Sequence, residues 1–518
     1  MLRRVVILLV VISALLWSAL ASSHRMSEAE KRGRRIYLRG ESPSGRTITA
    51  ILGGNDAVEV PAATLTCAGC HGADGKGKPE GGVIPSNITW SALMKTYGHT
   101  HNDGRTHPAF DELSLERAIT EGVDPAGNKL SVAMPKYQMS RADIADLLAY
   151  LKRIEDDRDP GLTADTITIA TLLPNSGAMA ETGAAMRDVL TAYFAELNQV
   201  GGIHHRRFVL QVATPEQAPK LLADESVFAL VGAMTAGKER EIAELVQRDE
   251  MPLIAPFTLY PNVSSPPERH TFYLFAGLSE QAQALVQFAA RQFASPSTRI
   301  AVLTVADERT STLASVLTVQ CDQAGWKHVL PLTYARGQLQ AASIIQRLRQ
   351  ERIDAVFFLG ASGDEKTLLD EAAKQNLVFP LFLPGALIAK ETLTALPQFK
   401  QKIYLSYPTL PTDQTPAASN EFRALLARHN ITPRHTAAQL SAYVAAQLLT
   451  EGLKRAGRDV TREKLIVALE GLYEYDTGLT PRLTYGPNRR SGAHGAYVIT
   501  FDPTKKQLTP ASEWINLN

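Results

Sequence analysis

The chain of 518 residues is long enough for about three or four compact domains at roughly 100–200 residues each. Hydrophobic residues make up 45% and charged residues 21% of it, a balance typical of folded proteins, which excludes wholesale disorder. The formal net charge of +1 gives no support for a nucleic-acid partner or for a strongly anionic membrane surface. Three cysteines are too few for a scaffold held together by disulfides.

The first residues have the three parts of a secretory signal peptide. Arg3 and Arg4 precede an apolar run over 5–21, whose A-L-A end places small residues where a signal peptidase reads them. We therefore predict a cleaved signal peptide over 1–21 and a mature protein in the periplasm. The alternative is an uncleaved N-terminus that tethers the protein to the membrane, although the run falls short of the roughly 20 residues that a spanning helix needs.

Residues 25–155 form the first predicted domain, and a charged segment over 156–164 is the predicted linker. Helical patterns open and close this domain, over 28–39 and 140–153. Ser140 is the predicted N-cap of the second pattern, and apolar residues follow it at helical spacing.

From Thr166 onward the pattern changes, because short apolar runs alternate with longer helical patterns. Strands that alternate with helices favour parallel α/β sheets. The segment 165–518 is large for one sheet and natural for two lobes. We therefore predict a two-lobed α/β domain that extends to the end of the chain.

The sequence C-A-G-C-H at 67–71 has the spacing by which c-type haem is attached. Cys67 and Cys70 would bond the porphyrin vinyl groups, and the imidazole of His71 would lie under the iron. The competing interpretations are a redox disulfide and half of a zinc site. A redox pair more often follows a strand in a βαβ unit, and zinc needs a second ligand pair, which the remaining Cys321 cannot supply. The motif therefore predicts one covalently attached haem c.

The second iron ligand is predicted to be Met134, which precedes a proline and lies six residues before the start of the closing helix. A methionine thioether raises the reduction potential relative to a second histidine. Met139, beside the predicted Ser140 cap, is expected to pack in the core, and the histidines at 99–107 are expected to be solvated in a polar loop. The other candidate ligands are Met94, Met139, His99, His101 and His107.

Further motifs follow one order along residues 28–153. They are Gly33 and Tyr37, Cys67-x-x-Cys70-His71-Gly72, Asp74-Gly75-Lys76-Gly77, Arg117-Ala118-Ile119, Gly122-Val123, Met134-Pro135-x-Tyr137 and the run 147–151. In this order the segment resembles a class I cytochrome c. The resemblance implies an all-α fold in which Gly33 and Tyr37 cross Tyr150. One departure is the long segment 40–61 before the haem motif, which we expect to shield a haem edge.

A second set of motifs runs from Thr166 to the end of the chain. It includes Leu173-Pro174-x-Ser176-Gly177, Glu196-Leu197-Asn198, Gly201-Gly202-Ile203, Leu230-Val231-Gly232, Pro252-Leu253-Ile254-Ala255-Pro256 and Asp354-Ala355-Val356-Phe357. With them the segment resembles type I periplasmic solute-binding proteins of the leucine/isoleucine/valine-binding branch. The resemblance implies two doubly wound lobes, joined by crossing strands, that close on a ligand by a hinge motion.

Such a cleft holds an amino-acid carboxylate through backbone N–H groups at helix N-termini and through hydroxyls beside them. The positions that match ligand-facing loops of the family are Ser176, Gly177, Thr235 and Thr258, each of which an ordinary turn or cap explains equally well. The second lobe lacks the family's Tyr-Gly pair and acidic loop, so Glu280 and Asp364 are the candidate substitutes for binding an ammonium group. The ligand is therefore expected to be an amino acid or another metabolite.

The leading hypothesis is a periplasmic electron-transfer protein, not an enzyme, whose solute-binding-like domain binds a small molecule or docks a redox partner. The sequence contains no catalytic motif such as G-x-S-x-G or a phosphate loop, and an iron with two protein ligands has no open position for a substrate. Two alternatives stay open. One is a solute receptor of an ABC-type uptake system with its permease, and the other is the cytochrome subunit of a periplasmic dehydrogenase.

Overall fold

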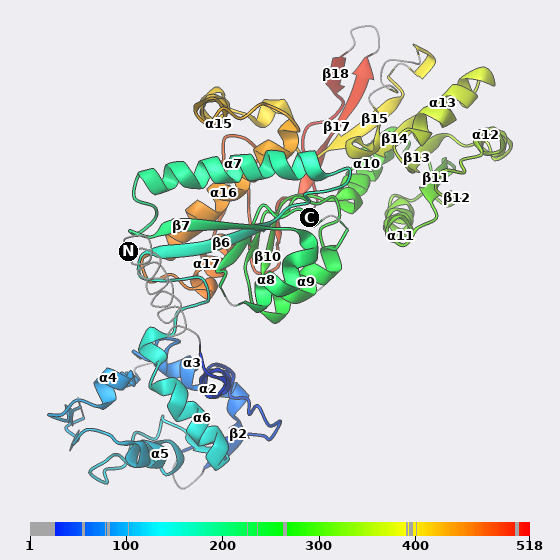
Figure 1. Ribbon diagram of the computed structural model, residues 1–518. Helices are drawn as coiled ribbons and strands as arrows, with labels where there is room; N and C mark the ends of the chain where they lie inside the picture. The colour runs from blue at the N-terminus through cyan, green and yellow to red at the C-terminus, as the bar shows by residue number, and fades with distance from the viewer. Residues whose placement is uncertain are drawn as a thin grey trace, which may run out of the picture. The chain divides into compact units, whose positions relative to one another are not determined.

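The computed structural model describes residues 26–517, apart from 54–56, 78, 80–82, 102, 225, 236, 263–266, 390–391, 393–396, 400 and 503–506 (Figure 1). The predicted signal peptide over 1–21 lies outside the described residues. The chain divides into two compact units, Met1–Asp157 and Arg158–Asn518. Among the helices of the described residues, none has the length and apolar character that crossing a bilayer requires.

The first unit combines short helices with a small antiparallel sheet. Its helices are α2 (Glu28–Arg39), α3 (Cys67–His71), α4 (Trp90–Leu93), α5 (Glu112–Thr120) and α6 (Arg141–Leu151). Its strands are β1 (Thr49–Leu52), β2 (Val58–Pro61), β3 (His99–Thr100), β4 (Thr106–His107) and β5 (Lys136–Gln138). The sheet has the order β2-β1-β5, and β3 pairs with β4.

The expectation of an all-α first unit is therefore confirmed only in part, because the unit also contains the sheet β2-β1-β5 and the pair β3-β4. The segment 40–61 is rich in β-branched residues, which favour extended backbone. It forms a hairpin of β1 and β2, and β1 also pairs with β5, the strand that follows Met134. This pairing joins residues far apart in the sequence, so no local sequence pattern predicts it.

The crossing of α2 and α6 forms the centre of the first unit, and α6 begins at the predicted cap Ser140. At the crossing the helices approach so closely that a Cβ added to Gly33 would lie 1.9 Å from the carbonyl oxygen of Asp146. Beside it the rings of Tyr37 and Tyr150 pack with their centroids 5.4 Å apart. The contact agrees with the crossing that the sequence predicted, because only glycine lets two helix backbones approach this far.

The second unit contains two sheets, the first of which has the order β16-β10-β9-β8-β6-β7 with all its strand pairs parallel. Its strands are β6 (Thr166–Leu172), β7 (Arg207–Ala213), β8 (Ala229–Val231), β9 (Leu253–Ile254), β10 (Thr271–Phe275) and β16 (Ser491–Ala493). The helices of this lobe are α7 (Ala180–Gln199), α8 (Ala218–Ala223), α9 (Glu239–Arg248), α15 (Pro416–Arg428), α16 (Thr436–Ala456) and α17 (Arg462–Glu470).

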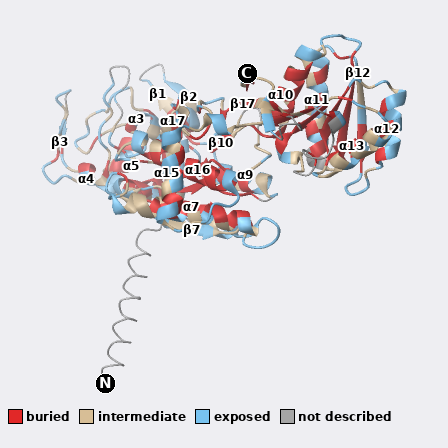
Figure 2. Cartoon of the chain, turned by 90° about the horizontal axis from the view of Figure 1, so that it is seen from above, coloured by how far each residue is buried: buried red, intermediate tan, exposed pale blue. Residues whose placement is uncertain are grey.

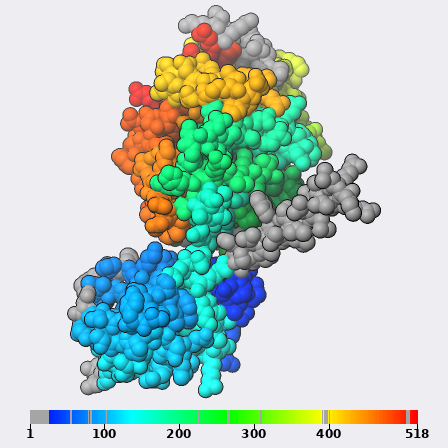
Figure 3. Space-filling model, turned by 60° about the vertical axis from the view of Figure 1, so that its left-hand side comes forward, coloured from blue at the N-terminus to red at the C-terminus, as the bar shows by residue number. Residues whose placement is uncertain are grey.

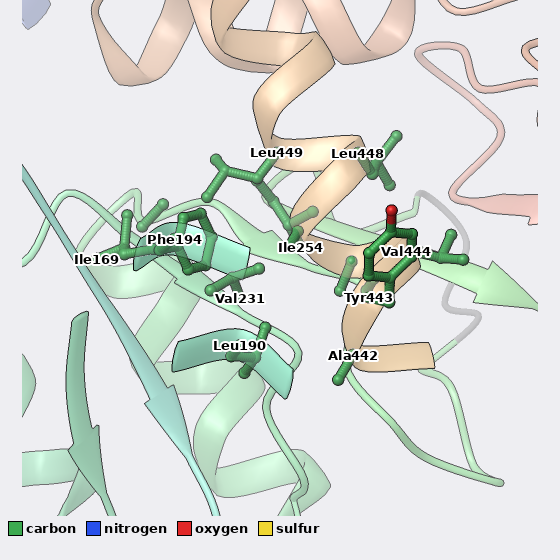
Figure 4. Close-up of a cluster of buried hydrophobic side chains, with 14 of the residues drawn as sticks. Ile169, Leu190, Phe194, Val231, Ile254, Ala442, Tyr443, Val444, Leu448 and Leu449 are labelled. Atoms are coloured by element: carbon green, nitrogen blue, oxygen red, sulfur yellow. The ribbon is translucent and has the colours of Figure 1, made fainter. Parts of the chain in front are cut away.

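The core of this lobe lies between its sheet and the helices α7 and α16 (Figure 4). Ile169, Val231 and Ile254 of the strands meet Leu190 of α7 and Leu449 of α16, and all of these side chains are buried. In Figure 3, residues of the early part of this unit, in green, lie beside residues of its late part, in orange. The lobe is therefore completed by chain that returns to it after the other lobe has been built.

The second sheet has the order β12-β11-β13-β14-β15-β17-β18, with β19 paired to β17. Its strands are β11 (Arg299–Val305), β12 (His328–Tyr334), β13 (Ala355–Leu359), β14 (Leu381–Pro384), β15 (Ile403–Tyr407), β17 (Gly495–Asp502), β18 (Gln507–Pro510) and β19 (Ile515–Asn516). The helices α10 (Leu278–Gln292), α11 (Glu308–Gln323), α12 (Ala341–Gln350) and α13 (Asp364–Lys374) accompany it. In Figure 2 the buried residues lie mainly on the strands and on α10 and α16.

The chain passes between the two lobes at three places: from β10 to α10, from β15 to α15 and from β16 to β17. The first and third passages lie side by side, since the amide of Ala276 donates a hydrogen bond of 3.1 Å to the carbonyl of Ala493. This topology agrees with two lobes joined by crossing strands. Cys321 is fully buried in the core of the second lobe, as expected for a small hydrophobic side chain, and burial raises its pKa to about 12.

Candidate functional site

The C-A-G-C-H motif forms the short helix α3, in which Cys67 and Cys70 lie one turn apart. Thr66 caps this helix, and its hydroxyl accepts a hydrogen bond of 3.1 Å from the amide of Gly69. Both thiols are free, and Cys67 is half-buried whereas Cys70 is exposed. Because residues three apart share a helix face, the motif presents both sulfurs on one side.

His71 ends α3 with a buried imidazole. Its Nδ1 lies 2.9 Å from the backbone oxygen of Ser86, so the ring donates its proton there and Nε2 keeps a free lone pair. Burial lowers the pKa of His71, which favours the neutral ring. A metal-binding histidine is commonly oriented in this way by a backbone carbonyl. The two thiols and this imidazole therefore fit a covalently held haem.

The redox-disulfide interpretation of the cysteine pair fits less well. A redox C-x-x-C pair more often follows a strand of a βαβ unit, whereas the strand that precedes α3 is β2, which lies in an antiparallel sheet. The zinc interpretation requires further ligands close by, and no group of three or more His, Cys, Asp or Glu in the described parts of the chain is arranged to hold a metal ion.

Among the candidate methionines, Met94 and Met139 pack against the core of the first unit. Met134 is half-buried in a turn, where its amide donates a hydrogen bond of 2.9 Å to the carbonyl of Ser131. The next residue, Pro135, is buried, and β5 follows directly. Met139 thus has the packing role that the sequence indicated, and Met134 remains the predicted ligand.

The three histidines of the segment 99–107 pack against one another. His107 is buried, and its Nε2 lies 2.8 Å from Nε2 of His101, while its Nδ1 lies 2.7 Å from the carbonyl of Pro108. The ring of His99 stacks on that of His107 with centroids 5.0 Å apart. The expectation of solvation is therefore wrong for His107, because the pairing of β3 with β4 brings the rings together.

The predicted solute-binding residues lie on loops that follow neighbouring parallel strands. Ser176 and Gly177 follow β6, Thr235 follows β8, and Thr258 follows β9. These strands are adjacent in the sheet, so their loops share one edge. Backbone hydrogen bonds of 2.7 Å join the first loop to the second and the second to the third, from Met234 to Leu172 and from Phe257 to Ala233.

The local role of each residue differs along this edge. Ser176 and Gly177 are exposed in a turn, and the hydroxyl of Thr258 accepts a hydrogen bond of 3.0 Å from the amide of Tyr260. Thr235 is buried, and its hydroxyl donates to Oε1 of Glu239 at 3.0 Å. Sequence reasoning missed Glu239, although its position four residues after Thr235 at the start of α9 is readable.

Glu239 thus takes the contacts expected for a ligand carboxylate. The same oxygen that accepts from Thr235 also accepts from the amide of Gly237 at 3.2 Å. Both donors belong to the loop that the sequence assigned to ligand binding. A carboxylate of the protein itself therefore lies where the resemblance implied a carboxylate of the ligand.

The two proposed substitutes for an ammonium site are engaged within the protein. Glu280 is buried at the start of α10, where it accepts a hydrogen bond of 3.0 Å from the amide of Gly277, and burial raises its pKa. Asp364 accepts a hydrogen bond of 2.7 Å from the hydroxyl of Tyr334. These contacts cap a helix and position a tyrosine, and each side chain has a structural role without a ligand.

Residues 166–507 match the periplasmic binding protein family. The chain belongs to this family. Residues 61–155 match cytochrome c, so the first unit carries a cytochrome c domain, which implies that it binds haem. Members of both families are typically periplasmic, and the binding-protein fold implies a small-molecule ligand.

Relatives and solved structures agree with this assignment. The Leu/Ile/Val-binding protein BraC3 of Rhizobium johnstonii is 22% identical over 327 residues, which cover 62% of this chain and 87% of that protein. The fatty acid ABC transporter substrate-binding protein of Thermomonospora curvata is 16% identical with a TM-score of 0.55, covering 70% of this chain and 95% of the other. A branched-chain amino acid ABC transporter of Thermus thermophilus with bound valine is 14% identical with a TM-score of 0.54, covering 69% and 97%. The structural likeness shows the fold of the binding-protein domain.

Proposed function

We propose that this protein is a periplasmic electron carrier with one haem c, attached through Cys67 and Cys70 and ligated by His71 and Met134. The observation that carries the proposal is the buried imidazole of His71, whose Nδ1 is held by a carbonyl while Nε2 stays free beside two thiols on one helix turn. When bound, the haem would supply reversible one-electron transfer. The protein would exchange these electrons with a periplasmic donor and acceptor.

The protein is proposed to be a carrier and not an enzyme. Ligation by both His71 and Met134 would leave the iron without an open position, and the residues around the haem would hold and bury it. The first test is the spectrum of the purified, reduced protein. A low-spin c-type spectrum is expected, and its absence would contradict the proposal.

Replacing Met134 by histidine is expected to lower the midpoint potential by on the order of 0.1 V, because a methionine ligand stabilises the ferrous state relative to a second imidazole. Spectroelectrochemical titration of the full-length protein measures this. Met139→Leu is the matched control, since Met139 packs against the core and a change of similar volume leaves the ligands in place. An unchanged potential in Met134→His would show that another side chain is the ligand.

For the second unit we propose that the binding-protein domain binds a small polar molecule between its lobes and that this domain also couples the carrier to a partner. A solute receptor for an ABC-type permease is the second candidate. It is favoured by the coverage of both lobes, since the chain spans 87% of a Leu/Ile/Val-binding protein. A dehydrogenase subunit is the third candidate.

Small-angle scattering and co-purification together separate these roles. A receptor is expected to become more compact when its metabolite is added, whereas a dehydrogenase subunit is expected to co-purify with a cofactor-bearing enzyme. If the protein neither becomes more compact nor co-purifies with an enzyme, the role that is left for the chain is electron transfer without solute uptake.

The Glu239 carboxylate leads to a prediction about ligand charge. A ligand carboxylate at the Thr235 loop would meet this like charge, so the native protein is expected to bind leucine weakly and to prefer neutral or cationic molecules. Glu239→Ala frees both donors and is expected to raise the affinity for leucine by at least about tenfold, measured by calorimetry. Glu241→Ala is the matched control, because this exposed residue of the same helix pairs only with Lys238 among the described contacts. Equal leucine affinity in Glu239→Ala and the native protein would refute the prediction.

A further inference from the structure

The residues on either side of the segment 41–61, Gly40 and Ala62, lie next to each other in the fold. Gly40 ends α2 with a positive φ of 65°, and a Cβ at this residue would lie 2.3 Å from the carbonyl carbon and oxygen of Ala62. The helix end and the start of the next turn are therefore in direct contact. The described residues between them, 41–53 and 57–61, belong to an excursion whose two ends are adjacent.

The excursion folds against the strand that follows the predicted methionine ligand. Its strand β1 pairs with β5 in the register Thr49 to Gln138, Ala50 to Tyr137 and Ile51 to Lys136. Ala50 is fully buried at this contact. Only Pro135 separates β5 from Met134.

A second contact ties the excursion to the helix after β5. The hydroxyl of Ser42 donates a hydrogen bond of 2.7 Å to Oδ1 of Asp143 in the first turn of α6, and both side chains are buried. The hydroxyl of Tyr137 in β5 itself donates to the carbonyl of Leu65, at 2.8 Å, just before the haem motif. The chain from Met134 to the start of α6 is therefore held on several sides.

We propose that the excursion 41–61 is a positioning element for the sixth haem ligand, which holds the turn that carries Met134 by pairing β1 with β5. The inference rests on the proposed function, since it takes Met134 as that ligand. A three-residue strand is marginal without a partner, and unpaired loops open locally at little cost in free energy. The excursion was expected to shield a haem edge. The β1–β5 pairing adds a role in keeping the methionine in place, and the shielding stays a prediction.

The test compares proline at two positions of the same sheet in the full-length haem protein. Ile51→Pro removes from the central strand β1 a backbone donor that faces β5, because Ile48 accepts from Ala62 on the β2 side and the backbone groups of successive residues face opposite neighbours. Glu59→Pro places the same residue directly opposite, in the exposed edge strand β2, where proline is tolerated. Imidazole displaces a methionine ligand when the ligand turn opens. We expect Ile51→Pro to bind imidazole at the ferric haem at least about tenfold more tightly, and Glu59→Pro to stay within about twofold of the native protein.

A second variant replaces 41–61 by a short Gly-Ser linker and is expected to show the same increase, because the ends of the excursion already touch. Haem staining tests the proposed function separately, since a native protein without covalent haem would refute that function. A haem-loaded Ile51→Pro whose imidazole affinity equals that of Glu59→Pro would overturn the inference. If neither variant folds with haem, hydrogen exchange of the native protein decides: protection of 136–138 like that of α6 supports the inference, and exchange as fast as in exposed loops overturns it.

Discussion

The double variant Cys67→Ala/Cys70→Ala is expected to lose all covalently attached haem. The two thiols lie on one face of α3, and the third cysteine, Cys321, is buried in the core of the other unit. A group that binds the folded state stabilises it, so the first unit is also expected to unfold at a lower temperature. Haem staining of the denatured protein measures attachment, and thermal unfolding measures stability.

The control for this variant is Cys321→Ala. It removes the third thiol from the core of the second unit and is expected to leave haem staining unchanged while it costs about 1 kcal/mol of stability there. Covalent haem in the double variant would show that the motif is not the attachment site. Loss of haem in Cys321→Ala would show that the second unit takes part in attachment.

Gly33→Ala is expected to destabilise the first unit by at least about 3 kcal/mol, the upper part of the range for overpacked cores. The added Cβ would lie 1.9 Å from the carbonyl oxygen of Asp146, and backbone atoms cannot rotate away as a flexible side chain could. The helices α2 and α6 would have to separate, which also opens the contact of Tyr37 with Tyr150. Thermal unfolding followed by far-ultraviolet circular dichroism is expected to show a melting temperature lower by about 10 °C or more.

Gly104→Ala serves as the comparison within the same unit. A Cβ at Gly104 would meet no atom within 4 Å, although its φ of +83° makes alanine strained there. A cost of about 1 kcal/mol is expected from this backbone strain alone. Equal effects of the two substitutions would show that backbone conformation, and not the helix crossing, sets the cost at Gly33.

Local patterns in the sequence predicted much of the fold. The cap of α6, the alternation of strands and helices after Thr166 and the role of Cys321 as a buried side chain were all readable, because each depends on residues close in sequence or on burial. The close approach at Gly33 was also predicted, through the resemblance to class I cytochromes c. The β1–β5 pairing was not, since it joins positions far apart along the chain.

The contacts of single polar groups were decided by tertiary structure. Glu280 caps α10, Asp364 accepts from Tyr334, and Glu239 turns back onto the Thr235 loop. Each of these residue types could equally face a ligand, and nothing in the sequence selects one rotamer over another. The histidines at 99–107 are a similar case, because the hairpin register brings their rings together.

The sequence by itself predicted covalent haem attachment at 67–71 and identified the family of the binding-protein domain, because the spacing of motifs and the hydrophobic periodicity are local properties of the chain. Tertiary structure alone decided which groups are already satisfied: the segment 40–61 pairs with the strand after Met134, and Glu239 holds the hydroxyl of Thr235. The physical reason is that a hydrogen bond depends on distances of about 3 Å between groups, which only the folded chain sets.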